Sequence, residues 1–192
     1  TNVKRAFELM TNFTQEGYDQ LIKYEDYINE LNKEIIRFTT IAISTELPIE
    51  NGQEIGLFLK IAADIERIGD HAMNIAQRGK QLFENNAHFS KEAIDEITIM
   101  SSLTNNILDE LKILSHDELY NIVDKVDVIE ESIDATTHEF SVHQLIRLKD
   151  QQCTPENSVI FTKTLTDFES IGGSGSNIGK NFSKIADIVA TL

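Results

Sequence analysis

The sequence predicts an all-α protein built as two tandem bundles of three helices each. Apolar residues recur at spacings of three and four along most of the 192 residues, and no stretch alternates convincingly with period two. In addition, the twelve-residue segment Asp64–Ile75 recurs 103 residues later as Asp167–Ile178, with six identical positions. An internal match at such a period indicates a duplicated unit. We therefore expect one three-helix repeat over residues 1–87 and a second over residues 88–192.

The first repeat carries three apolar stripes at helical spacing. They cover residues 3–17, where the stripe is interrupted near its end, then residues 21–42 and residues 58–82. Leu47-Pro48 and Asn51-Gly52 predict the break between the second and third helices, because proline cannot continue a helix and Asn-Gly favours a turn.

The second repeat follows the same plan. Its stripes cover residues 97–114, 119–148 and 161–189, and polar residues interrupt the first of them. Ser90 is a predicted N-cap for the fourth helix. Thr154 is a predicted N-cap for the sixth, with the next residue, a proline, in the first turn.

Composition excludes several classes of protein. Seventeen Lys and Arg against 32 Asp and Glu give a formal charge of -15, which would repel nucleic acid. No apolar run reaches the roughly 18 residues that span a bilayer, and residues 1–8 do not have the pattern of a signal peptide. The single cysteine, Cys153, cannot form an internal disulfide and indicates a reducing compartment. Because the sequence starts in helical register without a methionine, we expect it to be a piece of a longer protein.

Two carboxylate pairs could carry chemistry in the first repeat. Glu66 and Asp70 are four residues apart and therefore share one helix face. Glu25 and Asn29 have the same spacing on the preceding helix. A helical wheel places all four away from the apolar stripe, so we expect them on the outer surface or in a groove between helices.

The second repeat carries an incomplete version of this pattern. Glu130 and Asp134 form one pair, whereas Glu169 has Gly173 in place of a second carboxylate. Carboxylates that converge from two helices can bind an oxygen-preferring metal ion. The alternative is that they belong to ordinary solvated helix faces, and the sequence leaves both interpretations open.

The segment Asp64–Ala76 resembles the signature of PhoU domains, a family of two tandem three-helix bundles with Glu/Asp-x-x-x-Asp motifs. Glu25 with Asn29, and Glu130 with Asp134, resemble the other helix of that motif. The segments 143–148 and 153–156 are most similar to the PhoU-like C-terminal region of bacterial Na/phosphate cotransporters.

This resemblance implies a non-enzymatic regulator of phosphate homeostasis, as the cytoplasmic domain of a Na/phosphate cotransporter. It implies a location in the cytoplasm, tethered at the inner face of the plasma membrane by a transporter membrane domain of the same polypeptide, and a homodimer is a further expectation. It also implies an iron or zinc cluster on the acidic faces, with ligands from Glu25, Asn29, Glu66, Asp70, Glu130, Asp134 and Glu169. Gly173 and Ser174 replace the Asp and His of the motif, so a full cluster is not expected in the second repeat.

Two alternatives stand beside this interpretation. One is a free-standing PhoU regulator of phosphate uptake and signalling, in contact with a phosphate transporter and a histidine kinase. The other is a carboxylate-bridged metalloenzyme, but such bundles use Glu-x-x-His motifs, and here Gly69 and Gly172 occupy the His positions.

Two further features have more than one interpretation. The glycine-rich segment 172–179 lacks the spacing of a phosphate-binding loop and no strand precedes it, so we expect a helix there. Its glycines indicate either close helix packing at Gly172, Gly175 and Gly179 or a hinged segment. His71 is either a metal ligand or a hydrogen-bond partner of a carboxylate.

Overall fold

The protein is described by a computed structural model that covers residues 1–44, 49–112 and 116–190. These residues form six helices and no strand, which confirms the predicted all-α class. The helices are α1 (Asn2–Thr11), α2 (Gln15–Ile43), α3 (Ile49–Glu84), α4 (Lys91–Glu110), α5 (His116–Lys149) and α6 (Pro155–Ala190).

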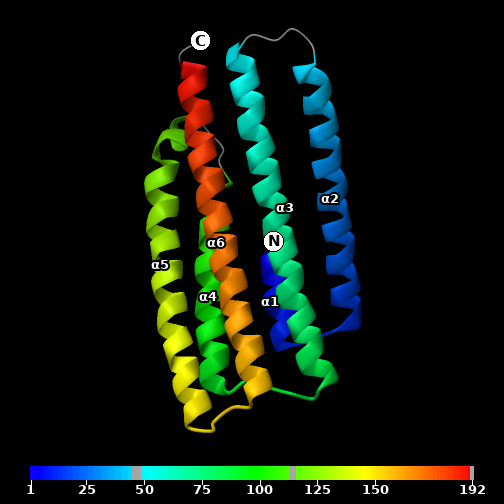
Figure 1. The fold of residues 1–192 in the computed structure, drawn as a ribbon, viewed down its shortest axis with the longest axis vertical. Helices are drawn as coiled ribbons and strands as arrows, with labels where there is room; N and C mark the ends of the chain where they lie inside the picture. The colour runs from blue at the N-terminus through cyan, green and yellow to red at the C-terminus, as the bar shows by residue number, and fades with distance from the viewer. Residues whose placement is uncertain (45–48, 113–115, 191–192) are drawn as a thin grey trace.

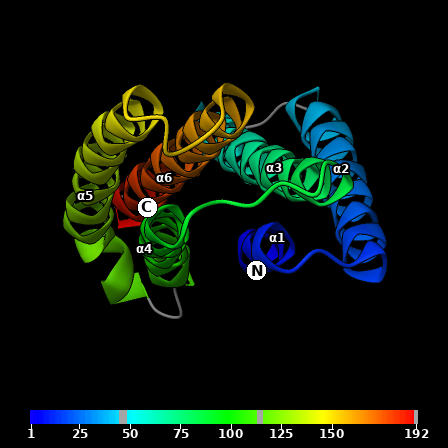
Figure 2. The ribbon, with the colours of Figure 1, turned by 90° about the horizontal axis from the view of Figure 1, so that it is seen from below.

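Four long helices form one layer, and two shorter helices cover one side of it. Helices α3 and α6 lie at the centre and pack against each other, with α2 and α5 on the outer flanks (Figure 1). Viewed from below, α1 and α4 lie on the same side of this layer (Figure 2). The predicted boundary at residues 87/88 falls in the connection between α3 and α4. The division into two repeats stays a prediction.

Four helices begin at side-chain caps. The hydroxyls of Thr1, Thr14, Ser90 and Thr154 each accept a hydrogen bond from the backbone N–H three residues later, at 3.3, 3.2, 3.3 and 3.2 Å. Each cap satisfies one of the N–H groups that the first turn of a helix leaves without a partner. The predicted caps at Ser90 and Thr154 are therefore confirmed.

The predicted turn at Asn51-Gly52 is wrong. Helix α3 begins at Ile49 and runs through both residues. A single Asn-Gly pair costs a helix only about 1–2 kcal/mol, which the remaining turns of a 36-residue helix can offset. The other part of that predicted break, Leu47-Pro48, lies outside the described residues.

Equivalent apolar positions are covered to different extents in the two repeats. Phe161 and Phe168 of α6 are fully buried, whereas Phe58 and Ile65 of α3, which lie 103 residues earlier, are 44% and 45% exposed. Phe161 packs against the ring of Phe89 and the guanidinium of Arg147. The equivalent part of the apolar stripe of α3 is half-exposed.

The glycines of α6 pack closely against neighbouring helices. A Cβ atom added at Gly172, Gly175 or Gly179 would lie 2.8 to 3.2 Å from the side chains of Ile133, Ile107 and Val126, respectively. Close packing, one of the two predicted roles, accounts for these three positions. None of the described helices is long and apolar enough to cross a bilayer.

Candidate functional site

Glu25 is buried between two helices, not at an outer position. Its side chain projects from α2 onto α3 at Gly69, where an added Cβ atom would lie only 2.4 Å from Oε2. The glycine therefore makes room for the carboxylate, and Glu25 is only 8% exposed. The sequence placed this residue on the outer surface or in a groove between helices, and the structure shows it between α2 and α3. Its burial was not predicted, because a helical wheel does not show that the facing helix has a glycine at the point of contact.

The Glu25 carboxylate lacks the partners that a buried charge requires. Both of its oxygens are buried without a hydrogen-bond partner. Burial, followed by the negative charges of Asp70 and Glu66, raises its pKa to about 7, and the nearby Asn29 side chain opposes this shift. The four residues predicted in the first repeat thus lie close enough to influence one another.

The second repeat brings its predicted carboxylates together in a similar way. Burial and then the charge of Asp134 raise the pKa of Glu130, and the same two causes raise the pKa of Glu169. No atom lies within 4 Å of a Cβ added at Gly173. The position at which the first repeat has Asp70 is therefore open in the second.

These residues form a candidate cation site, but their side chains are not grouped in the arrangement of metal ligands. Within the described ranges, no three His, Cys, Asp or Glu side chains are grouped closely enough to hold a metal ion. The orphaned oxygens of Glu25 nevertheless fit a cation that would supply the missing partner. Carboxylate and amide oxygens suit hard, oxygen-preferring metals better than zinc, which more often takes nitrogen or sulfur ligands in proteins.

His71 and Asp167 belong to a second polar cluster, on the side of α3 that faces α6. His71 Nδ1 lies 2.8 Å from Asp167 Oδ1, and Arg78 forms an ion pair with the same carboxylate. Burial, followed by the positive charge of Arg67, lowers the pKa of His71. Of the two roles predicted for His71, the structure shows the hydrogen-bond partner. The sequence signal that points to Asp167 is its place in the internal repeat, 103 residues after Asp64.

Sequence analysis also missed a buried ion pair in the second repeat. Arg147 of α5 donates to both carboxylate oxygens of Glu96 on α4, at 3.0 and 2.6 Å. His143 Nδ1 lies 2.8 Å from the same carboxylate, and the Arg147 guanidinium stacks on Phe161. Nothing in the sequence distinguishes Glu96 from the exposed acids around it.

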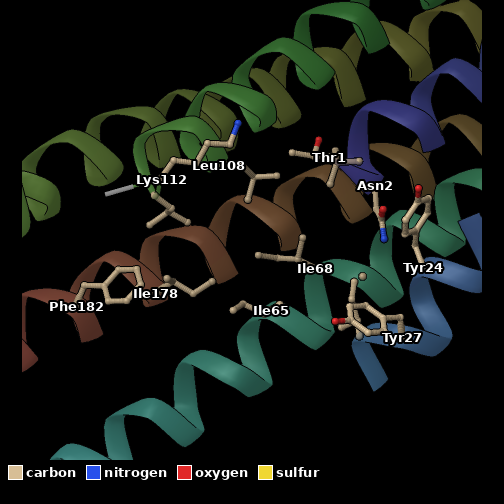
Figure 3. Close-up of a pocket in the computed structure, with 14 residues that line it drawn as sticks. Thr1, Asn2, Tyr24, Tyr27, Ile65, Ile68, Leu108, Lys112, Ile178 and Phe182 are labelled. Carbon is tan, nitrogen blue, oxygen red and sulfur yellow. The ribbon is translucent and has the colours of Figure 1, made fainter. Parts of the chain in front are cut away.

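An apolar cavity of about 380 Å³ lies where the two halves of the chain meet. Figure 3 shows Tyr24, Tyr27, Ile65 and Ile68 on one side and Leu108, Ile178 and Phe182 on the other, with Thr1 at its edge. This cavity continues the half-exposed apolar stripe of α3. It lies beside Gly69, and thus close to Glu25.

The fold is that of an all-α protein in which acidic side chains of α2 and α3, and of α5 and α6, lie close enough that the charge of one raises the pKa of another. Residues 1–79 match the PhoU domain model. The chain is 30% identical over 113 residues to a phosphate-specific transport system accessory protein PhoU homolog from Clostridium acetobutylicum, covering 57% of this chain and 52% of that protein. It is 25% identical over 181 residues to PhoU homolog 1 of Thermotoga maritima, covering 90% and 74%.

Two solved structures have a similar fold over almost the whole chain. The crystal structure of PhoU from Pseudomonas aeruginosa matches with a TM-score of 0.75 and 16% identity, covering 100% of this chain and 90% of that one. The phosphate transport system regulatory protein PhoU from Streptococcus pneumoniae matches with a TM-score of 0.78 and 19% identity, covering 96% and 86%. Residues 1–79 thus match the PhoU domain, and the chain has the fold of PhoU proteins.

Proposed function

We propose that this protein is a non-enzymatic PhoU-type regulator that acts as an accessory to a phosphate uptake system on the cytoplasmic side of the membrane. The match of residues 1–79 to the PhoU domain carries this proposal. The two curated relatives are named accessory proteins of phosphate-specific transport, and the first of them is matched over only about half of its length.

The relatives support the second of the expectations drawn from the sequence better than the first. The named relatives and solved structures are PhoU proteins, and none is a Na/phosphate cotransporter. We therefore favour a regulator that contacts a separate transporter over a domain of the transporter polypeptide itself.

Deletion of the gene in its host tests this function. Phosphate uptake by cells grown in phosphate-rich medium should rise severalfold, and a copy of the gene should restore the normal rate. If the additional uptake requires sodium, the regulated transporter is a Na/phosphate cotransporter. Unchanged uptake in the deletion strain would contradict the regulatory function.

We further propose that Glu25, Asn29, Glu66 and Asp70 bind a hard metal ion, which would act as a Lewis acid and neutralise the buried charge. The support is the orphaned carboxylate of Glu25 and the proximity of the other two acids. Glu130, Asp134 and Glu169 would form a weaker second site, because Gly173 supplies no ligand.

A metal titration at two pH values tests this site. Saturating Mn²⁺ or Fe³⁺ should raise the melting temperature by about 5–10 °C. Because the pKa of Glu25 is about 7, its proton competes with the metal at lower pH, and the increase should be larger at pH 8 than at pH 6. Glu66→Ala with Asp70→Ala should abolish the increase, whereas Glu130→Ala with Asp134→Ala should retain most of it. Absence of bound metal by elemental analysis, together with no thermal response, would refute the site.

A further inference from the structure

Each copy of the repeated segment carries an aspartate and, ten residues later, an asparagine. They are Asp64 with Asn74 on α3, and Asp167 with Asn177 on α6. Both aspartates are buried, at 7% and 4% exposure. Buried carboxylates require polar partners, so each of these two aspartates needs a hydrogen-bond or ion-pair partner.

The partners come from the opposite copy of the segment. Asn74 Nδ2 donates to Asp167 Oδ1 at 3.4 Å. Asn177 lies close enough to Asp64 for its side chain to lower the pKa of that carboxyl, against the larger effect of burial. The aspartate of each copy thus faces the asparagine of the other. Ten residues correspond to about 15 Å along a helix, so the two contacts lie far apart on the α3–α6 interface.

These residues lie on a different face of α3 from the carboxylates of the candidate cation site. Asp64, His71, Asn74 and Arg78 follow one another at spacings of seven, three and four, and each has a partner on α6 or on the adjacent turn. Glu66 and Asp70 lie on the side of α3 from which they influence Glu25 on α2. In α3, the repeated segment therefore contributes polar residues to two faces, one toward α6 and one toward Glu25 on α2.

We propose that Asp64, Asn74, Asp167 and Asn177 form a reciprocal clamp that sets the rotation and axial register of α3 against α6. A single contact would still allow the helices to turn or slide, but two contacts about 15 Å apart restrict both motions. The clamp thereby positions the face of α3 that carries Glu66 and Asp70. It concerns contacts within the chain and does not depend on the regulatory function proposed above.

The two ends of the clamp differ in strength. Asp167 also pairs with His71 and Arg78, whereas Asp64 has only Arg67, at 3.8 Å with its side chain 63% exposed. Ser174 and Asn181 stand 103 residues after His71 and Arg78, so the weaker end has no equivalent partners. An exposed ion pair at this distance stabilises little. The Asp64–Asn177 end is therefore the sensitive place to test.

The test is a double-mutant cycle at that end. Asn177→Asp alone places two carboxylates against each other and should lower the melting temperature by about 3–6 °C. Adding Asp64→Asn restores one carboxylate and one amide, and should return the melting temperature to within about 2 °C of the unmodified protein. As a matched control, adding Asp167→Asn instead removes the aspartate of the same copy and should give no rescue.

Hydrogen exchange provides a readout that a purely local defect would not change. In Asn177→Asp, amides around residue 64 on α3 and around residue 177 on α6 should both exchange faster, and the rescued double variant should reverse both effects. Rescue together with reversal at both helices supports the clamp. Unchanged stability of Asn177→Asp, or failure of Asp64→Asn to rescue it, overturns the clamp.

Discussion

Replacing Phe161 with alanine should lower the free energy of unfolding by about 3–5 kcal/mol, whereas the same change at Phe58 should cost less than about 1 kcal/mol. The two phenylalanines occupy equivalent positions of the internal repeat. Phe161 is fully buried, with the ring of Phe89 edge-on at 5.7 Å and the Arg147 guanidinium 4.9 Å from its centroid. Removing it leaves a cavity and breaks both contacts, while the half-exposed Phe58 is already in contact with water.

Urea-induced unfolding of the two variants, followed by circular dichroism, measures this difference. The slope with urea should stay the same in both, so that a change in the midpoint reports stability alone. Equal losses at the two positions would contradict the unequal coverage of the two repeats.

Much of the fold could be predicted because its determinants are local. Apolar spacing located all six helices, and hydroxyl residues before polar first turns located the caps at Ser90 and Thr154. The packing of the helices against one another was harder to predict from the sequence. The apolar stripe of α2 continues through Leu31 and Phe38, yet both are exposed, because periodicity shows which face is apolar but not whether another helix covers it.

The candidate site was predictable in its residues but not in its environment. Spacing grouped Glu66 with Asp70, and comparison between the two copies singled out Glu25 as the counterpart of Glu130. The burial of Glu25 depends on a glycine that faces it from another helix, a tertiary contact that no local pattern encodes. The proposed crosswise arrangement of Asp64 and Asn177 could not be predicted for the same reason, although both residues were among the six identical positions.

Replacing Arg147 with alanine should destabilise the protein by about 3–5 kcal/mol, because Glu96 would keep a buried charge without its bidentate partner. His143 lies 2.8 Å from Glu96 but is partly exposed, and one imidazole cannot replace two guanidinium hydrogen bonds. The loss of packing on Phe161 adds to the effect. Urea unfolding again gives the free energy.

A double variant that removes both charges separates the cost of leaving the Glu96 charge unpaired from the rest of the stability lost in Arg147→Ala. Glu96→Leu with Arg147→Met removes both charges and keeps most of the volume, so it should recover at least half of the stability lost in Arg147→Ala. Lys33→Ala provides the exposed control, since its pair with Glu30 lies at the surface and should contribute less than about 1 kcal/mol. If the double variant is as unstable as Arg147→Ala, then packing and hydrogen-bond geometry, and not an uncompensated charge, account for the role of Arg147.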